Sequence, residues 1–131
     1  MIQLNPRYEA IFNPDNIDQD CDRIASLMNV EADFIKEALD AGLYKQALTM
    51  YLQLLKSMTK HFVEDEHYCY FDDMYSPEYT MQWIYEAIQK HEIDAESQTL
   101  LDEGHKEILQ SECYEDYGVP SYIERFMLHH D

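Results

Sequence analysis

The sequence is poor in glycine, proline and basic residues. It contains three glycines and four prolines in 131 residues. So few turn-forming residues disfavour a β-sandwich or barrel, which needs many tight turns between short strands. Lysine and arginine total 9 against 27 aspartates and glutamates, which gives a formal net charge of −18. Because phosphates and anionic lipids repel such a chain, we expect neither direct nucleic-acid binding nor membrane binding.

Cysteines and long apolar runs are also scarce. The three cysteines, Cys21, Cys69 and Cys113, lie far apart and never form a CxxC motif. This disfavours a disulfide framework and a structural zinc cluster, and reduced thiols are typical of the cytosol. No run approaches the roughly 20 apolar residues of a membrane span, and the first residues lack the apolar segment of a secretory signal. We therefore expect a cytoplasmic protein.

The remaining composition is that of a globular helical protein. Hydrophobic residues make up 46% of the chain and aromatic residues 13%, which suits one core in a chain of this length. No segment alternates between polar and apolar residues with a period of two, and no low-complexity linker divides the chain. We predict one compact all-α domain over residues 1–131, with about five to six antiparallel helices.

Apolar residues recur at helical spacing in five principal segments. The first helix is predicted to follow Asn13-Pro14 and to end at Asn29, before a second helix over Val30–Ala41. Phe34 and Ile35 contribute to the apolar face of that second helix, and Gly42 stops it. The third segment, LYKQALTMYLQLLKSMTKHF, is the longest, and its apolar stripe consists of Ala47, Tyr51, Leu54, Leu55, Met58 and Phe62.

Start signals place the later helices. Ser76-Pro77-Glu78 combines an N-cap serine, a proline at the first helical position and an acidic residue near the helix dipole. The buried face of the helix that follows is predicted to contain Trp83, Ile84, Ala87 and Ile88. Asp94 is predicted to cap the next helix, which runs through Leu109. After the break at Gly118-Val119-Pro120, residues 120–130 are predicted to form a short terminal helix.

One stretch has the spacing of a known helical repeat. In AGLYKQALTMYLQLL the pattern is carried by Gly42, Tyr44, Ala47, Tyr51 and the pair Leu54-Leu55. It resembles the turn and second helix of a tetratricopeptide repeat, in which small residues let paired helices approach. Counting Val30–Ala41 as the first helix, the resemblance covers one repeat, residues 30–55. It implies a scaffold for binding a peptide or protein, with a tetratricopeptide-like helix pair in the N-terminal half.

Residues 22–42 resemble a DNA-binding helix-turn-helix, with the turn at Asn29-Val30. In that family the second helix presents its early residues to the major groove. Here those residues would include Glu31, Asp33 and Glu37, which the phosphates would repel. We therefore interpret the pattern as a helix corner and not as a DNA reader.

The stretch HFVEDEHYCYFDDMYSPE, residues 61–78, has the composition of a ligand cluster. Its Glu64-x-x-His67 spacing, echoed by Asp102-x-x-His105, is similar to that of ferritin-like di-metal sites. At about 100° per residue, however, Glu64 and His67 fall off the apolar face of the helix before them. The weak metal candidates that remain are surface ligands: His61, Glu64 and His67.

A second interpretation treats residues 61–76 as an acidic, aromatic-rich connector that contacts a partner. Tyrosine offers a large contact area with a polar tip. The partner-binding candidates are Tyr68, Tyr70, Phe71, Tyr75, Tyr79, Asp72 and Asp73. The partner would be a protein or peptide, and the acidic surface favours a basic one.

The sequence offers no catalytic or cofactor-binding motif: it has no GxSxG and no glycine-rich phosphate loop. We predict a non-enzymatic interaction domain without a cofactor. The alternative is an acidic nucleic-acid mimic, since the chain is similar in charge to antirestriction and nuclease-inhibitor proteins. Its carboxylates would stand in for phosphates, with these candidates: Asp15, Asp18, Asp22, Glu64, Asp65, Asp72, Asp73, Glu112, Glu115 and Asp116.

Overall fold

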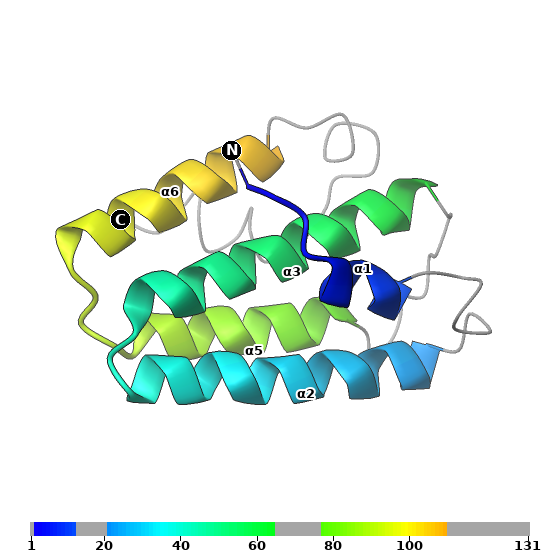
Figure 1. Cartoon of the computed structure of the whole chain (residues 1–131), viewed down its shortest axis with the longest axis horizontal. Helices are drawn as coiled ribbons and strands as arrows, with labels where there is room; N and C mark the ends of the chain where they lie inside the picture. Colours follow the sequence, from blue (N-terminus) through cyan, green and yellow to red (C-terminus); the bar gives the residue numbers. More distant parts are fainter. Residues whose placement is uncertain (1, 13–20, 65–76, 110–131) are drawn as a thin grey trace.

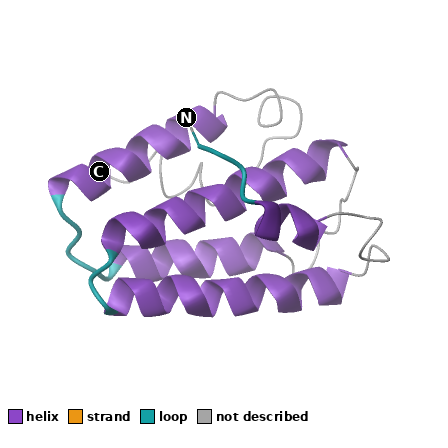
Figure 2. Cartoon of the chain, in the orientation of Figure 1, coloured by secondary structure: helices purple, strands orange, loops and turns teal. Residues whose placement is uncertain are grey.

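The computed structural model describes residues 2–12, 21–64 and 77–109, and every element in these ranges is a helix (Figures 1 and 2). The helices are α1 (Pro6–Phe12), α2 (Cys21–Asp40), α3 (Tyr44–Glu64), α5 (Pro77–Gln89) and α6 (Ala95–Leu109). The prediction of the all-α class is confirmed. Within the described ranges, no helix combines the length and apolar character needed to cross a membrane.

The four long helices lie side by side and alternate in direction, as Figure 1 shows. Helix α3 occupies the centre, because it contacts α1, α2, α5 and α6. Helix α2 packs against both α3 and α5, whereas α6 packs mainly against α3. The core therefore forms around α3, and α2 and α6 lie on opposite sides of it.

Five of the six residues predicted for the apolar stripe of α3 form the core, and the side chain of the sixth, Phe62, lies outside the described part of the chain. Ala47, Tyr51, Leu54, Leu55 and Met58 are all fully buried. Their spacing of three and four residues places them on one face of the helix. Because α3 contacts four other helices, this one stripe supplies a large part of the hydrophobic stabilisation.

Gly42 ends α2 as predicted. Its φ angle is +78°, a conformation that side chains with a Cβ rarely adopt. The amide of Leu43 donates to the carbonyl of Ala38 at 2.9 Å, and the amide of Gly42 donates to that of Leu39 at 3.0 Å. These two bonds form a Schellman motif, which satisfies the last carbonyls of α2 and turns the chain into α3.

The predicted break at Asn29 is wrong, because α2 continues from Cys21 to Asp40. Asparagine disfavours a helix interior when its side chain forms a hydrogen bond with the neighbouring backbone. Here its Oδ1 accepts a hydrogen bond from the hydroxyl of Thr80 in α5, at 3.1 Å. This tertiary contact occupies the side chain and the helix continues, so the helix corner proposed for the Asn29-Val30 turn does not exist.

Helix α1 was not predicted, although its start signal is present. The side chain of Asn5 accepts a hydrogen bond from the amide of Arg7 at 2.9 Å, with proline at the first helical position. Tyr8, Ile11 and Phe12 are buried in the core. Burial and the neighbouring Glu31 carboxylate raise the pKa of Tyr8 to about 12.

Helix α5 begins at Pro77, as predicted, and Ile84 and Ile88 are buried. The prediction for Trp83 is wrong, because 45% of this residue is exposed. Met81 and Tyr85 are buried instead. The core face of α5 is therefore rotated away from the tryptophan.

Asp94 caps α6 as predicted: its Oδ1 accepts a hydrogen bond from the amide of Ser97 at 2.8 Å. The terminal helix predicted for residues 120–130 lies outside the described residues.

We expect Asp94→Ala to lower the free energy of unfolding by about 1 kcal/mol, because it removes this capping acceptor. Asp94→Asn keeps an acceptor oxygen and should retain most of that stability. Urea denaturation of the two variants measures the difference. Equal losses in both variants would show that charge, and not the hydrogen bond, is responsible.

Candidate interaction surface

Most of the predicted site residues lie outside the described side chains. This holds for all seven partner-binding candidates between Tyr68 and Tyr79, for His67, and for every carboxylate proposed for nucleic-acid mimicry. Glu64 is the last residue of α3, but its side chain is not described. These predictions therefore stay predictions.

His61 is described, and it packs against α1. Its Nε2 lies 3.0 Å from Oε2 of Glu9, and its ring stacks on Phe12 with centroids 6.0 Å apart. Glu9 also receives hydrogen bonds from Ser57 and from Lys60, the latter at 3.1 Å. Burial alone would raise the pKa of the Glu9 carboxyl, but the bonds from Ser57 and Lys60 bring it below its usual value. The cluster joins α1 to α3.

This cluster is not arranged for nucleophilic catalysis or metal binding. The Ser57 hydroxyl donates to the Glu9 carboxylate and not to His61, and Ser57 is fully buried, so the hydroxyl is closed to a substrate. Among the described residues, no group of three or more metal-ligating side chains comes together. His61 thus has a structural partner in Glu9.

His105 lies in the core of the bundle. It is 1% exposed, and its Nε2 lies 2.7 Å from the hydroxyl of Tyr51. The ring meets Tyr51 and Tyr85 edge-on, with centroid distances of 5.4 and 5.7 Å. Asp102 is exposed and accepts a hydrogen bond from Gln98 at 2.9 Å. Asp102 and His105 therefore do not face a common site.

The clearest surface feature is an apolar stripe on the outer face of α2. Leu27 is 36% exposed, Val30 49% and Phe34 43%. Their spacing of three and four residues aligns them over about 10 Å of helix. Scattered exposed apolar residues are normal, but three aligned on one helix form a contiguous patch. We call Leu27, Val30 and Phe34 the α2 stripe.

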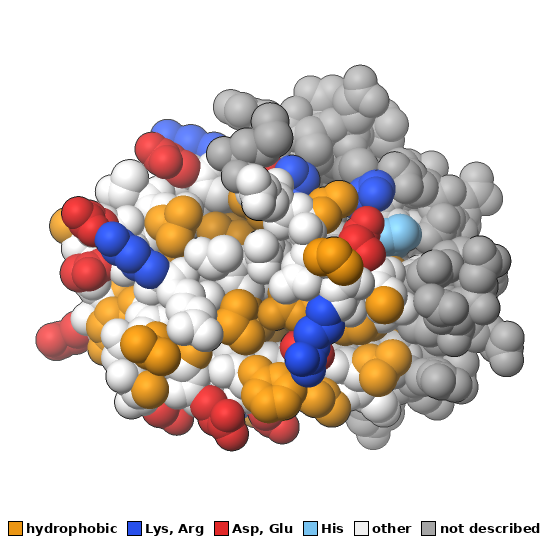
Figure 3. All heavy atoms as spheres, in the orientation of Figure 1, with side chains coloured by type: hydrophobic (Ala, Val, Ile, Leu, Met, Phe, Trp, Pro, Cys, Tyr) orange, Lys and Arg blue, Asp and Glu red, His pale blue; other side chains and the backbone are white. Residues whose placement is uncertain are grey.

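A row of carboxylates borders the α2 stripe. Asp33, Glu37 and Asp40 are exposed and lie three to four residues apart on the same helix; we call them the acidic row. Figure 3 shows acidic side chains along the edge of α2, beside hydrophobic ones. Asp40 lies 3.2 Å from Nε2 of His91, whereas Asp33 and Glu37 form no ion pair with any described residue. Two carboxylates of the row are therefore available to a partner.

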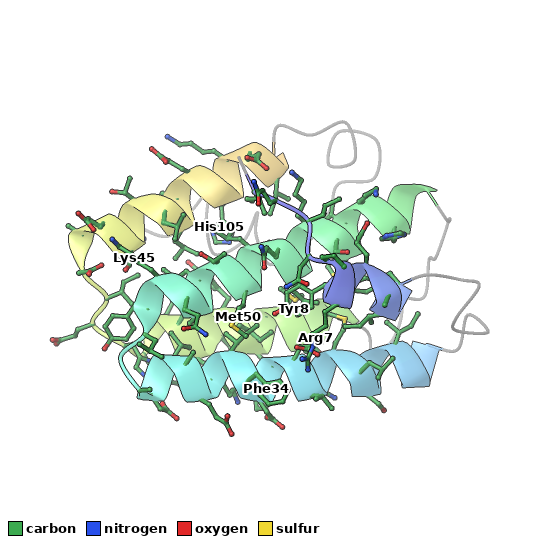
Figure 4. The ribbon with its side chains drawn as sticks, in the orientation of Figure 1. Arg7, Tyr8, Phe34, Lys45, Met50 and His105 are labelled. Carbon is green, nitrogen blue, oxygen red and sulfur yellow. The ribbon has the colours of Figure 1, made fainter. Side chains whose placement is uncertain are left out.

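On each side of the acidic row, a cationic side chain lies over an exposed aromatic ring. The Arg7 guanidinium lies 5.2 Å from the centre of the Phe34 ring and pairs with Glu31 at 2.7 Å, as Figure 4 helps to show. Beyond the acidic row, the Lys36 ammonium lies 2.8 Å from the centre of the Trp83 ring. Such cation–π contacts fix the orientation of exposed rings. Each contact thus favours one orientation of an exposed ring before any partner arrives.

Sequence reasoning missed this surface because it divided α2 at Asn29. In one continuous helix, the buried residues Ala25, Met28 and Ile35 and the α2 stripe together cover an arc of about 220°. An arc wider than half the helix circumference cannot be buried against the neighbours on one side alone. That excess is the sequence signal for an exposed apolar face.

No protein-family model, curated protein or solved structure matches this chain.

Proposed function

We propose that this protein is a non-enzymatic interaction domain that binds a basic amphipathic helix along α2. The observation that carries the proposal is the α2 stripe beside the acidic row, in which Asp33 and Glu37 have no ionic partner among the described residues. An amphipathic helix can place its apolar side chains on such a stripe and its lysines or arginines opposite the carboxylates.

Charge selects a basic helix over other occupants of this surface. With a net charge of −18, two copies of the chain would bring acidic surfaces together. Like charges facing each other across an interface cost free energy, which disfavours a homodimer through the acidic row. A basic partner is instead attracted over long range and associates faster.

The resemblance of residues 30–55 to a tetratricopeptide unit supports the same kind of function, because that family serves as a peptide-binding scaffold. Under this proposal the helix pair presents its outer face to the ligand. The 61–76 connector, with its tyrosines, would extend the contact beyond the described helices.

A titration followed by tryptophan fluorescence tests the proposal. Trp83 is the sole tryptophan of the chain and lies beside the acidic row. We expect a helical peptide with leucines on one face and flanking lysines to change the Trp83 emission with saturation. The same peptide with glutamates in place of the lysines should give no saturable change. Raising the salt concentration from about 0.1 M to 1 M shortens the screening length from roughly 10 to 3 Å, so the affinity should fall.

Substitutions on and away from α2 test where the peptide binds. Phe34→Ala should weaken peptide binding by about tenfold, as expected for an aromatic anchor. Leu43→Ala is the matched control, since Leu43 is 51% exposed but lies in the turn after α2. Asp33→Asn with Glu37→Gln should also weaken binding and reduce its salt dependence, whereas Glu92→Gln with Asp102→Asn should not. Equal effects from the test and control variants would contradict the proposed surface.

A further inference from the structure

A cavity of about 310 Å³ lies between α3, α6 and the N-terminal segment, away from the α2 stripe. In Figure 1 this segment crosses over α3 from α6 toward α1. The apolar part of the cavity lining comes from Ile2, Leu52 and Leu100. Gly104 also lines it, and the absence of a side chain there allows α6 to approach α3 closely. The volume is at the lower end of the range for small-molecule sites.

The N-terminal segment is fastened at one end of this cavity. The amide of Ile2 donates to both carboxylate oxygens of Glu107, at 3.0 and 3.1 Å. The Lys56 ammonium donates to the carbonyl of Ile2 at 2.7 Å and to Glu107 at 3.0 Å. Burial would raise the pKa of Glu107, but the bonds from Lys56 and Ile2 bring it below its usual value. Glu107 is therefore fully engaged, and it holds the wall of the cavity in place.

Two of the remaining polar residues of the lining, Gln3 and Glu103, are uncommitted. Glu103 is exposed and forms neither a hydrogen bond nor an ion pair with any described residue. The Gln3 side chain likewise has no hydrogen bond within the described part of the chain. Gln53 uses its carbonyl oxygen to accept from Asn5, at 3.3 Å. The lining thus combines an apolar floor with a free carboxylate at its rim.

We propose that this cavity binds a short primary alkylammonium ion. The alkyl chain lies against Leu52 and Leu100, and the ammonium group donates hydrogen bonds to Glu103. A cavity of this size has the volume of about ten water molecules in the liquid, so a six-carbon amine fits. The overall charge of −18 concentrates cations at the surface and repels carboxylate ligands.

The test uses n-hexylammonium, n-hexanol and hexanoate, each titrated into the 131-residue chain at neutral pH. Amide resonances are followed by ¹⁵N–¹H correlation NMR. The chain has three glycines, so the Gly104 amide falls in an uncrowded region. We expect saturable shifts at Gly104 and Leu100 with hexylammonium, at least threefold weaker binding of hexanol, and no saturation with hexanoate. Equal binding of hexanol and hexylammonium, or no saturable shift with the amine, would overturn the proposal.

Substitutions test whether the NMR shifts arise from binding in the cavity. Thr49→Phe fills the cavity from an exposed position on α3 and should weaken binding more than tenfold. Thr99→Phe places the same ring on α6 outside the lining and should leave binding unchanged. Glu103→Gln should weaken binding by about threefold, the usual effect of one exposed ion pair, and Glu92→Gln should have no effect. Loss of binding in Thr99→Phe, or unchanged binding in Thr49→Phe, would overturn the assignment to this cavity. No outcome depends on the α2 surface.

Discussion

Between pH 7 and pH 5, the free energy of unfolding should fall by about 2 kcal/mol less in His105→Gln than in the wild-type protein. Burial lowers the pKa of His105 from its ordinary value of 6.5 to about 3. The unfolded chain binds a proton on this residue below pH 6.5, whereas the folded chain stays neutral until about pH 3. The free energy of unfolding is therefore highest above pH 6.5, and it falls progressively as the pH drops from 6.5 toward 3. At pH 5 the loss from one such group amounts to about 2 kcal/mol.

Glutamine is a suitable replacement because it cannot ionise in this range and still offers a partner to the Tyr51 hydroxyl. Urea denaturation at pH 7 and pH 5 gives the pH dependence of each protein. Glu9 and Glu107, whose pKa values lie below the ordinary range, contribute to acid instability in both proteins, so their effect cancels in the difference. His91→Gln is the matched control, since that histidine lies near the surface. If His105→Gln kept the wild-type pH dependence, the histidine would not be neutral in the folded core.

Gly104→Ala should destabilise the protein by up to about 2 kcal/mol, although alanine is the better helix former. A Cβ at this position would lie 2.4 and 2.6 Å from the two Cδ atoms of Leu52 and 3.0 Å from its Cγ. Leu52 is itself fully buried, so the methyl group forces its side chain out of its packed position. Overpacking of this kind commonly costs 1–3 kcal/mol. The gain of about 1 kcal/mol in helix propensity offsets only part of that cost.

A second substitution distinguishes this steric cause from others. Leu52→Ala alone should cost about 2–5 kcal/mol, because it leaves a cavity between α3 and α6. In that background the added methyl group of Gly104→Ala meets no obstacle, so the substitution should become stabilising by about 1 kcal/mol. Urea denaturation of the four proteins forms a double-mutant cycle. Additive effects of the two substitutions would contradict the close contact.

Local signals were sufficient for much of the fold. The glycine after Ala41, the proline at position 77 and the cap at Asp94 each act through the backbone within a few residues, and all three helix boundaries were predicted. The apolar stripe of α3 was predicted because almost every large residue on it faces the core. Asn29 shows the limit, because its side chain is satisfied by Thr80, 51 residues away in the chain.

The candidate surface was harder to predict from the sequence than the helix boundaries were. Periodicity identifies an apolar face but not whether a neighbouring helix covers it, so Trp83 was assigned to the core and Phe34 to a buried face. The burial of His105 was not predicted. Its burial follows from the partner that Tyr51 supplies across the bundle and from the two tyrosine rings around it.

Mapping the binding of the lysine-flanked amphipathic peptide by ¹⁵N–¹H correlation NMR tests the proposed function most directly. The account predicts saturable shifts concentrated at Leu27, Val30, Phe34 and the acidic row, with Trp83 at the margin. Phe34→Ala should abolish most of them. Shifts that are spread evenly over the acidic surface, or that are unchanged in Phe34→Ala, would contradict a docking site on α2.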